Sequence, residues 1–384
     1  AEFKLINEIF GIEKGNEILL KQADIIKKHA VDGYLYGRVG EDHFVVIADE
    51  ATFNEEHLYE CRETLQNVLS DSVYNVRVCF GIYRTDNMNE SLSFMCDKAS
   101  FAVASIKDDT HSFIAYYDDT MLEAAIKYKT IVDEFDDAIK AGEFKMYLQP
   151  QISAKTRRLT GAEALVRRIK PDGTIISPID FIPVYEKSGL ISRLDRYIWE
   201  QAAAKLGEWK KAGINMSISV NISPKDFYYI DIFNTFAGLI KKYDIEPSNL
   251  KIEITETTIM SDVPNLMGEL EELRKAGFTL EMDDFGSGYS SLNTLKDINV
   301  DVLKVDMGFI KETKNVKKSR IILASVIKMA KELNLLIITE GVETEEQVDN
   351  LTKLGCDVFQ GYYFSKAIDV NEFEKRYLYR KKAG

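Results

Sequence analysis

The feature that most constrains this 384-residue chain is a repeating unit that begins after Gly142. In each unit an apolar strand ends at a polar residue, a helix follows, and a glycine precedes the next strand. Helix ends are marked by Ala212-Gly213, Ala276-Gly277 and Leu354-Gly355, each behind a last turn that carries lysine. The predicted strands are Lys145–Leu148, Leu159–Leu165, Met216–Val220, Leu250–Ile254, Phe278–Met282, Val302–Val305, Leu335–Thr339 and Val358–Gln360. Strands and helices in this alternation over about 240 residues predict a (β/α)8 barrel of the TIM type.

The first third of the chain also alternates between helical and strand patterns. Asn16–Ala30 and Glu55–Leu69 are amphipathic, Phe44–Ala48 is apolar, and Tyr74–Tyr83 alternates like a strand. A connecting helix with one apolar face follows and ends near Gly142. The sequence therefore predicts an α/β protein with a small α/β domain at residues 1–118, a linker helix at 119–142 and the barrel at 143–384.

Composition excludes several classes of function. The net charge of −13 argues against DNA as a partner, because nucleic-acid binding calls for a basic face. No run approaches the roughly 20 apolar residues that cross a bilayer, so we expect a cytoplasmic location. This expectation includes the case in which the chain is the soluble part of a larger membrane-anchored protein. No histidine follows His111, which excludes a Ser-His-Asp triad or histidine-ligated zinc from the barrel. The four cysteines have no metal-like spacing.

Polar side chains stand at the predicted strand ends, where the active site of a barrel lies. They are Gln149, Glu163, Arg167, Asn221, Glu253, Glu256, Asp283, Asp284, Lys304, Asp306, Glu340, Glu343 and Gln360. Any one of them has a plain explanation as a helix cap or a solvated loop charge. So many carboxylates at one mouth, however, are costly unless they are paired or bind cations.

The adjacent carboxylates of Asp283 and Asp284 suggest a pair of bound cations. Carboxylate and amide oxygens favour Mg²⁺ or Mn²⁺ over zinc or copper. A pair that bridges two ions suggests two-metal hydrolysis of a phosphate ester. In this interpretation Lys304 orients or deprotonates the attacking water and Arg167 holds a phosphate oxygen.

The motif Glu163-Ala164-Leu165-Val166-Arg167 resembles the signature of the EAL family of cyclic-di-GMP phosphodiesterases. The resemblance covers residues 130 to 380 approximately and runs through further motifs at the strand ends. These are Pro178 to Ile191, Asn221-Ile222-Ser223, Glu253-Ile254-Thr255-Glu256, Asp283-Asp284-Phe285-Gly286, Lys304-Val305-Asp306, Glu340-Gly341-Val342-Glu343 and Gln360-Gly361-Tyr362. Two positions depart from the family pattern: Arg168 stands where an aromatic residue is common, and Ala367 where proline is common.

The resemblance implies hydrolysis of cyclic-di-GMP to linear pGpG with two Mg²⁺ or Mn²⁺ ions. It implies one metal held by Glu163, Asn221, Glu253 and Asp283, and a second served by Asp283 and Asp284. The implied catalytic residues are Lys304, Glu340 and Glu343. The implied substrate-binding residues are Gln149, Arg167 and Gln360, and Glu256 steadies the loop after the aspartate pair. It also leads us to expect a homodimer formed through the barrel.

The N-terminal domain resembles a GGDEF diguanylate cyclase domain that has lost its chemistry. Phe3-Lys4-x-x-Asn7 and Gly15-Asn16 match its nucleotide-binding segment, with Asn16 in place of an aspartate. Glu41 in Gly40-Glu41-Asp42-His43-Phe44 replaces a glycine that lets the backbone approach phosphates. Val31 and Tyr34 replace the Arg and Asp of the inhibitory site, and the first strand falls before residue 1. We expect a regulatory domain that is not a cyclase, with weak nucleotide binding left open.

Two alternatives to an active phosphodiesterase remain. One is a catalytically silent receptor that binds cyclic-di-GMP at the barrel mouth. Missing metal-ligand residues would favour this alternative, whereas every expected metal-ligand position carries a suitable residue here. The other is a barrel lyase or aldolase, which needs a Schiff-base lysine in an apolar pocket, whereas Lys304 is predicted to lie among carboxylates.

Overall fold

The computed structural model describes residues 2–30, 34–66, 77–85, 87, 89–107, 109, 111–261, 263, 265–285, 295, 298–307 and 316–379. Contacts divide the chain into two compact units, Ala1–Lys129 and Thr130–Gly384. Val31 and the residues 286–292 that follow the aspartate pair lie outside the described residues, as does part of the strand expected at Tyr74–Tyr83.

The N-terminal unit mixes helices and short strands, as predicted. Its elements are α1 (Glu2–Phe10), α2 (Ile12–His29), β1 (Leu35–Gly40), β2 (His43–Ile47), α3 (Glu56–Gln66), β3 (Phe80–Ile82), α4 (Leu92–Ser105) and β4 (Ile114–Tyr116). β1 and β2 form an antiparallel hairpin, while β3 and β4 pair in parallel. Apolar side chains of α1, α2 and α3, among them Ile6, Ile18 and Leu65, form its small core.

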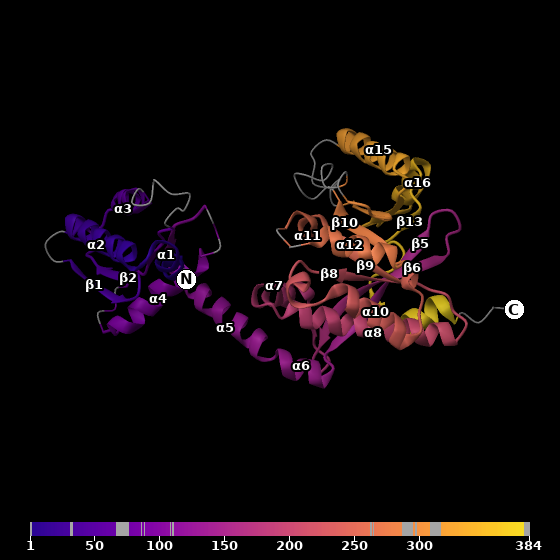
Figure 1. Cartoon of the computed structure of the whole chain (residues 1–384), viewed down its shortest axis with the longest axis horizontal. Coiled ribbons are helices and arrows are strands. Elements are labelled where there is room, and N and C mark those ends of the chain that lie inside the picture. The colour runs from indigo at the N-terminus through magenta and orange to yellow at the C-terminus, as the bar shows by residue number, and fades with distance from the viewer. Residues whose placement is uncertain are drawn as a thin grey trace. The chain divides into compact units, whose positions relative to one another are not determined.

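Eight strands close a barrel in the second unit (Figure 1). They are β5 (Phe144–Ser153), β6 (Leu159–Ile169), β8 (Ile218–Ile222), β9 (Leu250–Thr255), β10 (Leu280–Phe285), β11 (Val302–Asp306), β12 (Leu336–Glu340) and β13 (Val358–Phe359). Pairing of β5 with both β6 and β13 completes the ring. Two short strands pair antiparallel with the barrel strands: β7 (Ile175–Ile176) with β6, and β14 (Ile368–Asp369) with β5. Each strand coincides with one of the eight predicted from sequence, which confirms the barrel.

The barrel differs from a uniform (β/α)8 repeat at its first strand. β5 runs antiparallel to both of its neighbours, β6 and β13. Residues 154–158 connect β5 to β6 in a tight turn that includes Arg157 at φ 57°. A parallel connection needs a dozen or more residues, usually a helix, so this turn permits only the antiparallel arrangement.

Helices cover the outside of the strands (Figure 1). They are α7 (Pro178–Ser188), α8 (Ile191–Lys211), α9 (Asp226–Tyr229), α10 (Ile232–Tyr243), a 3₁₀ turn (Pro247–Asn249), α11 (Glu256–Met260), α12 (Leu266–Lys275), α15 (Val316–Glu332), α16 (Glu345–Leu354), α17 (Val370–Phe373) and a π-turn (Glu374–Leu378). Gly213, Gly277 and Gly355 have positive φ at the predicted helix ends, which confirms those caps. Buried aromatic residues, including Trp199 and Phe236, join α8 and α10 over the strands.

The linker is two helices rather than the single predicted one. α5 (Asp119–Asp133) crosses the boundary between the units, and α6 (Phe135–Ala141) follows it. Glu134 lies between them, and α6 ends as predicted at Gly142, which adopts a left-handed φ of 64°. Buried Phe135 contacts Phe144 and Tyr185, so α6 is anchored in the barrel unit.

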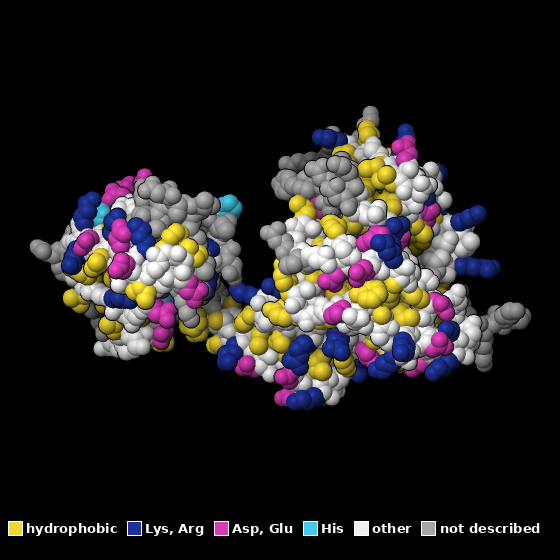
Figure 2. Space-filling model, in the orientation of Figure 1, with side chains coloured by type: hydrophobic (Ala, Val, Ile, Leu, Met, Phe, Trp, Pro, Cys, Tyr) yellow, Lys and Arg dark blue, Asp and Glu magenta, His cyan; other side chains and the backbone are white. Residues whose placement is uncertain are grey.

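The surface carries charges of both signs. On the face shown in Figure 2, lysine and arginine side chains alternate with aspartate and glutamate over the barrel unit. Among the described helices, none combines the length and the apolar character that crossing a membrane would require.

Candidate active site

Four carboxylates surround the ammonium of Lys304 at the carboxyl ends of the barrel strands. The distances from Lys304 Nζ are 2.7 Å to Glu340, 3.0 Å to Glu253, 3.2 Å to Asp283 and 3.5 Å to Glu163. These residues come from five strands, β6, β9, β10, β11 and β12. Lys304 and Glu253 have no exposed surface, and Glu163 and Asp283 are buried as well. The structure thus gathers five of the residues predicted at the strand ends in one cluster.

Amide side chains join this carboxylate cluster from β5, β8 and the end of β13. Gln360 donates hydrogen bonds to Glu163 and, at 3.4 Å, to Gln149 Oε1. Asn221 Nδ2 lies 3.4 Å from Glu163 Oε1, and Gln151 donates to Gln360 Oε1 at 3.3 Å. A Cβ on Gly361 would lie 2.2 Å from the Val342 carbonyl oxygen, so only glycine lets the chain after Gln360 pack this closely.

Burial and like charge dominate the electrostatics of the cluster. Burial and the neighbouring Glu163 raise the pKa of Glu253 well above its usual value, in spite of Lys304. Burial raises the pKa of Glu340 to about 8, although Lys304 opposes the shift. Burial alone would lower the pKa of Lys304, but the four carboxylates reverse this effect and raise it. Lys304 therefore remains an ammonium in this arrangement.

The oxygen atoms of the carboxylate cluster suit divalent cations as ligands, both in their charge and in the hydrogen bonds that they lack. Within the described residues, Glu253 Oε2 has no hydrogen-bond donor, and Glu253 Oε1 and Glu340 Oε1 face the shared Lys304 ammonium at 3.0 and 2.7 Å. One ammonium faces four carboxyl groups, more than a single cation can balance if all four ionise, in line with the raised pKa values of Glu253 and Glu340. In the described part of the chain, no three His, Cys, Asp or Glu side chains are already gathered around one point as a bound ion needs. Lys304 occupies that central place instead.

The remaining predicted residues lie around this cluster. Asp284 is exposed, adopts a left-handed φ of 55°, and donates its backbone N–H to Asp283 Oδ1 at 2.9 Å. Arg167 is half-buried, and its guanidinium carbon lies 5.8 Å from the Tyr147 ring centroid. Burial lowers the pKa of Arg167.

Two glutamates lie farther along the strand-end loops. Glu256 is buried as the first residue of α11, directly after β9. Glu343 is exposed and donates its backbone N–H to Gln347 Oε1 at 2.7 Å, beside the capping box that starts α16. The structure thus places Glu343 at the rim of the mouth.

Three polar residues of the barrel interior were missed by the sequence prediction. Buried Glu281 accepts hydrogen bonds from Ser219 at 2.8 Å and Lys251 at 2.9 Å, and it pairs across the strands with Glu253. Glu281, Lys251 and Gln151 each stand two residues from a predicted site residue. Because side chains on a strand alternate between two faces, this spacing of two was the signal that could have identified them.

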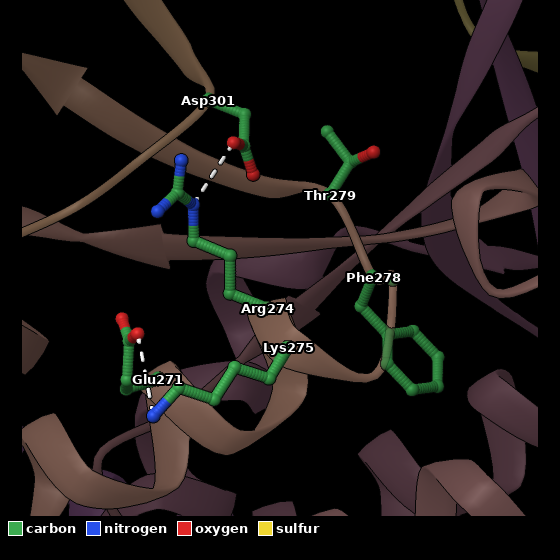
Figure 3. A pocket seen from close by; sticks show the side chains of 7 residues that line it. Glu271, Arg274, Lys275, Phe278, Thr279 and Asp301 are labelled. Carbon is green, nitrogen blue, oxygen red and sulfur yellow. Dashed lines mark hydrogen bonds and ion pairs between the residues drawn. The ribbon is translucent and has the colours of Figure 1, made fainter.

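A separate pocket of about 370 Å³ is lined by residues that include Arg274, Lys275 and Phe278 (Figure 3). It lies at the amino ends of β10 and β11, opposite the carboxylate cluster. Its lining includes Thr279 and Asp301, which directly precede β10 and β11. Its charges are already paired, because Arg274 Nε lies 3.1 Å from Asp301 and Lys275 lies 3.6 Å from Glu271. The pocket therefore offers no unpaired catalytic group and is separate from the candidate site.

Comparison with known proteins assigns the barrel unit to a family. Residues 132–367 match the family described as "EAL domain". The chain belongs to the EAL domain family. The EAL region resembles a solved structure of PaMucR phosphodiesterase in complex with c-di-GMP, with a TM-score of 0.60 and 32% identity over 64% of this chain and 99% of that one. An EAL domain protein from Listeria monocytogenes is also 32% identical, with a TM-score of 0.53, over 64% of this chain and 97% of that chain.

The part that precedes the EAL domain also has relatives. Residues 1–112 match the family described as "Diguanylate cyclase, GGDEF domain". The signaling protein YkoW of Bacillus subtilis is 31% identical over 97% of this chain and 47% of its own length. MucR of Pseudomonas aeruginosa, a bifunctional diguanylate cyclase/cyclic di-GMP phosphodiesterase, is 28% identical over 96% of this chain and 55% of its own length. The chain thus spans about half the length of these curated relatives.

Proposed function

We propose that this chain hydrolyses cyclic-di-GMP to linear pGpG by metal-dependent cleavage of one phosphodiester bond. The observation that carries the proposal is the buried cluster of Lys304 with four carboxylates, formed by residues of the EAL family motifs. A site with this many charged groups does not favour an apolar substrate, whereas a phosphodiester bound together with divalent cations complements its charge. The c-di-GMP bound in the similar PaMucR structure supports the same substrate.

The proposed cofactor is a pair of Mg²⁺ or Mn²⁺ ions. Glu163, Asn221, Glu253 and Asp283 would hold one ion, and Asp283 with Asp284 would hold the other. Two observations support this assignment: Glu253 Oε2 has no hydrogen-bond donor among the described residues, and four carboxyl groups share the single Lys304 ammonium. When bound, such ions act as Lewis acids toward the phosphate and lower the pKa of a coordinated water.

The remaining residues act on the substrate and the attacking water. Lys304 keeps its proton at Nζ in this cluster, so it is a hydrogen-bond donor that orients the water. Glu340 contacts Lys304 and holds its ammonium in place, while Glu343 supports the rim of the site. Arg167 binds a phosphate oxygen through its guanidinium.

Amide groups and Glu256 complete the proposed site. Gln149 and Gln360, which are hydrogen-bonded to one another, contact the nucleotide. Glu256, at the start of α11, has the proposed role of steadying the segment after the aspartate pair, which lies outside the described residues. None of these three roles involves Lys304 or the four carboxylates around it, which act in the reaction.

The N-terminal unit is proposed to be regulatory and without cyclase activity. Glu41 lies in the β1–β2 turn at a φ of 37°, a conformation that suits the glycine it replaces. Its side chain adds bulk and negative charge where phosphates would approach. Formation of a homodimer through the barrel and weak nucleotide binding by this unit remain part of the proposal.

The test is incubation of the whole chain with cyclic-di-GMP and Mg²⁺ or Mn²⁺, with the products separated by chromatography. The proposal expects linear pGpG that forms only with metal. Tight binding without any product would instead favour the silent receptor, and neither binding nor product would reject both functions.

A further inference from the structure

Arg168 differs in orientation from the site residues beside it on β6. Side chains on a strand alternate between faces, so Glu163 and Arg167 share the face of the site whereas Arg168 points away from it. Arg168 is nevertheless 2% exposed, which is unusual for an arginine. It also stands where the EAL signature commonly has an aromatic residue. A buried cation at this position therefore needs an explanation of its own.

Two glutamates, Glu134 in the linker and Glu143 directly before β5, bind the Arg168 guanidinium. Arg168 Nη2 lies 2.7 Å from Glu134 Oε2, and Nε lies 2.9 Å from Glu143 Oε2. Its guanidinium carbon also lies 5.7 Å from the ring centroid of Phe144. Lys170 approaches the other oxygen of Glu134 at 3.7 Å. The planar guanidinium can satisfy both carboxylates at once, which a lysine ammonium on a flexible stem cannot reproduce.

The two glutamates belong to separate structural segments. Glu134 is the single residue between α5 and α6, and Glu143 directly precedes β5. Ile169, which follows Arg168 and ends β6, donates its backbone N–H to the Glu143 carbonyl at 2.8 Å. Arg168 therefore connects the end of β6 to Glu134, the joint of the linker helices α5 and α6, and to Glu143 at the start of β5.

We propose that Arg168 is a positioning residue that couples the joint of the linker helices to Arg167 and so sets substrate affinity. This inference rests on the proposed function. Arg167 is the next residue along the backbone, and its Nη1 donates to the Val166 carbonyl at 2.7 Å. The place of its guanidinium thus depends on the course of the last residues of β6. Moving Glu134 with the linker displaces Arg168 and, through the shared peptide, Arg167.

The test uses Arg168→Met, Glu134→Gln and the double variant of the whole chain, assayed with cyclic-di-GMP. Asp136→Asn is the matched control, because Asp136 lies two residues after Glu134 and pairs with Arg193 of α8 at 2.5 Å, but both side chains are more than half exposed. Arg168→Met should raise KM about fivefold or more while kcat stays within about twofold, since Arg167 acts in binding. Glu134→Gln should raise KM less, and the double variant should be no worse than Arg168→Met.

A rise in KM with kcat unchanged indicates that Arg168 positions Arg167, whereas partial loss of the fold lowers kcat through the amount of active protein. An unchanged KM in Glu134→Gln would overturn the inference, and because Glu134 is partly exposed this variant remains informative even where Arg168→Met fails to fold. An equal rise in KM for Asp136→Asn, or a fall in kcat alone, would also overturn it. If the wild-type chain forms no pGpG, the proposed function fails; the Kd of cyclic-di-GMP, measured by calorimetry for the same variants, then tests the coupling separately.

Discussion

Lys304 Nζ lies 3.0 Å from Glu253 Oε1, and neither side chain is exposed to solvent. Strands β9 and β11 are not neighbours, because β10 lies between them, so this pair spans the interior of the barrel. A buried ammonium that contacts several carboxylates provides part of the positive charge that the cluster needs. The proposed metal ions would provide the rest.

Lys304→Met should destabilise the metal-free protein by about 3–5 kcal/mol, because it leaves buried carboxylates without their cation. Adding Mn²⁺ should recover much of the loss and hydrolysis should remain abolished. Thermal unfolding in chelator and in Mn²⁺ measures the first effect. The control is Lys251→Met, which removes the partner of Glu281 deeper in the barrel; equal recovery by Mn²⁺ in both variants would contradict the account.

Mg²⁺ and Mn²⁺ should support turnover, whereas Ca²⁺ should bind without supporting it. Ca²⁺ prefers longer bonds and more oxygen ligands than the proposed in-line attack allows. The measurement is the rate of pGpG formation after chelation and readdition of each ion, with the Tm shift reporting on binding. Full activity in Ca²⁺ alone would refute this prediction.

The N-terminal unit should form no cyclic-di-GMP from GTP, since Glu41 and Asn16 alter phosphate approach and guanine recognition. The assay uses the whole chain carrying Asp283→Asn, so that a product of cyclisation would not be hydrolysed. Incubation with GTP and Mg²⁺ should release no pyrophosphate above background. Measurable cyclic-di-GMP would show that the unit is a cyclase after all.

Asp226→Asn should stabilise the protein at neutral pH. Asp226 lies fully buried at the start of α9 and accepts a hydrogen bond from the Ser223 N–H at 2.7 Å. Burial raises its pKa to about 6 even though Asp195, a carboxyl whose own pKa is raised by burial and by Asp226, hydrogen-bonds to it. Between pH 4 and 6 the folded state holds a proton that the unfolded state releases, so this group makes stability fall as the pH rises. Asparagine keeps the acceptor and cannot ionise.

The expected gain for Asp226→Asn at pH 7.5 is at most about 3 kcal/mol, the equivalent of roughly two pKa units. Urea unfolding should show this gain at pH 7.5 and little of it near pH 4. Asp231→Asn is the control, because Asp231 is an exposed helix cap whose pKa is lowered by Asn234. A gain that is independent of pH would contradict the assigned cause.

The sequence predicted the barrel and its charged mouth because both depend on local patterns. Apolar strands and glycine caps mark the repeat, and polar residues at the strand ends must meet once the barrel closes. The antiparallel β5 was not predicted, because the predicted strand stopped at Leu148, whereas β5 continues to Ser153, and this concealed how short the connection to β6 is. The break at Glu134 was also missed, since glutamate is a good helix former and its contact with Arg168 is tertiary. Interior residues such as Glu281 went unassigned because strand ends alone were considered.

The central claim is that Asp283 belongs to both metal ions of a hydrolytic site, and the rate of Asp283→Asn tests it most directly. The variant should lose about a thousandfold or more in pGpG formation, because both proposed ions would lose the Asp283 carboxylate as a ligand. Affinity for cyclic-di-GMP should fall far less, since Arg167, Gln149 and Gln360 remain, and Asp306→Asn should be milder in rate. If Asp283→Asn kept more than about a tenth of the wild-type rate, a cost under ~1.4 kcal/mol, the two-metal assignment would be wrong.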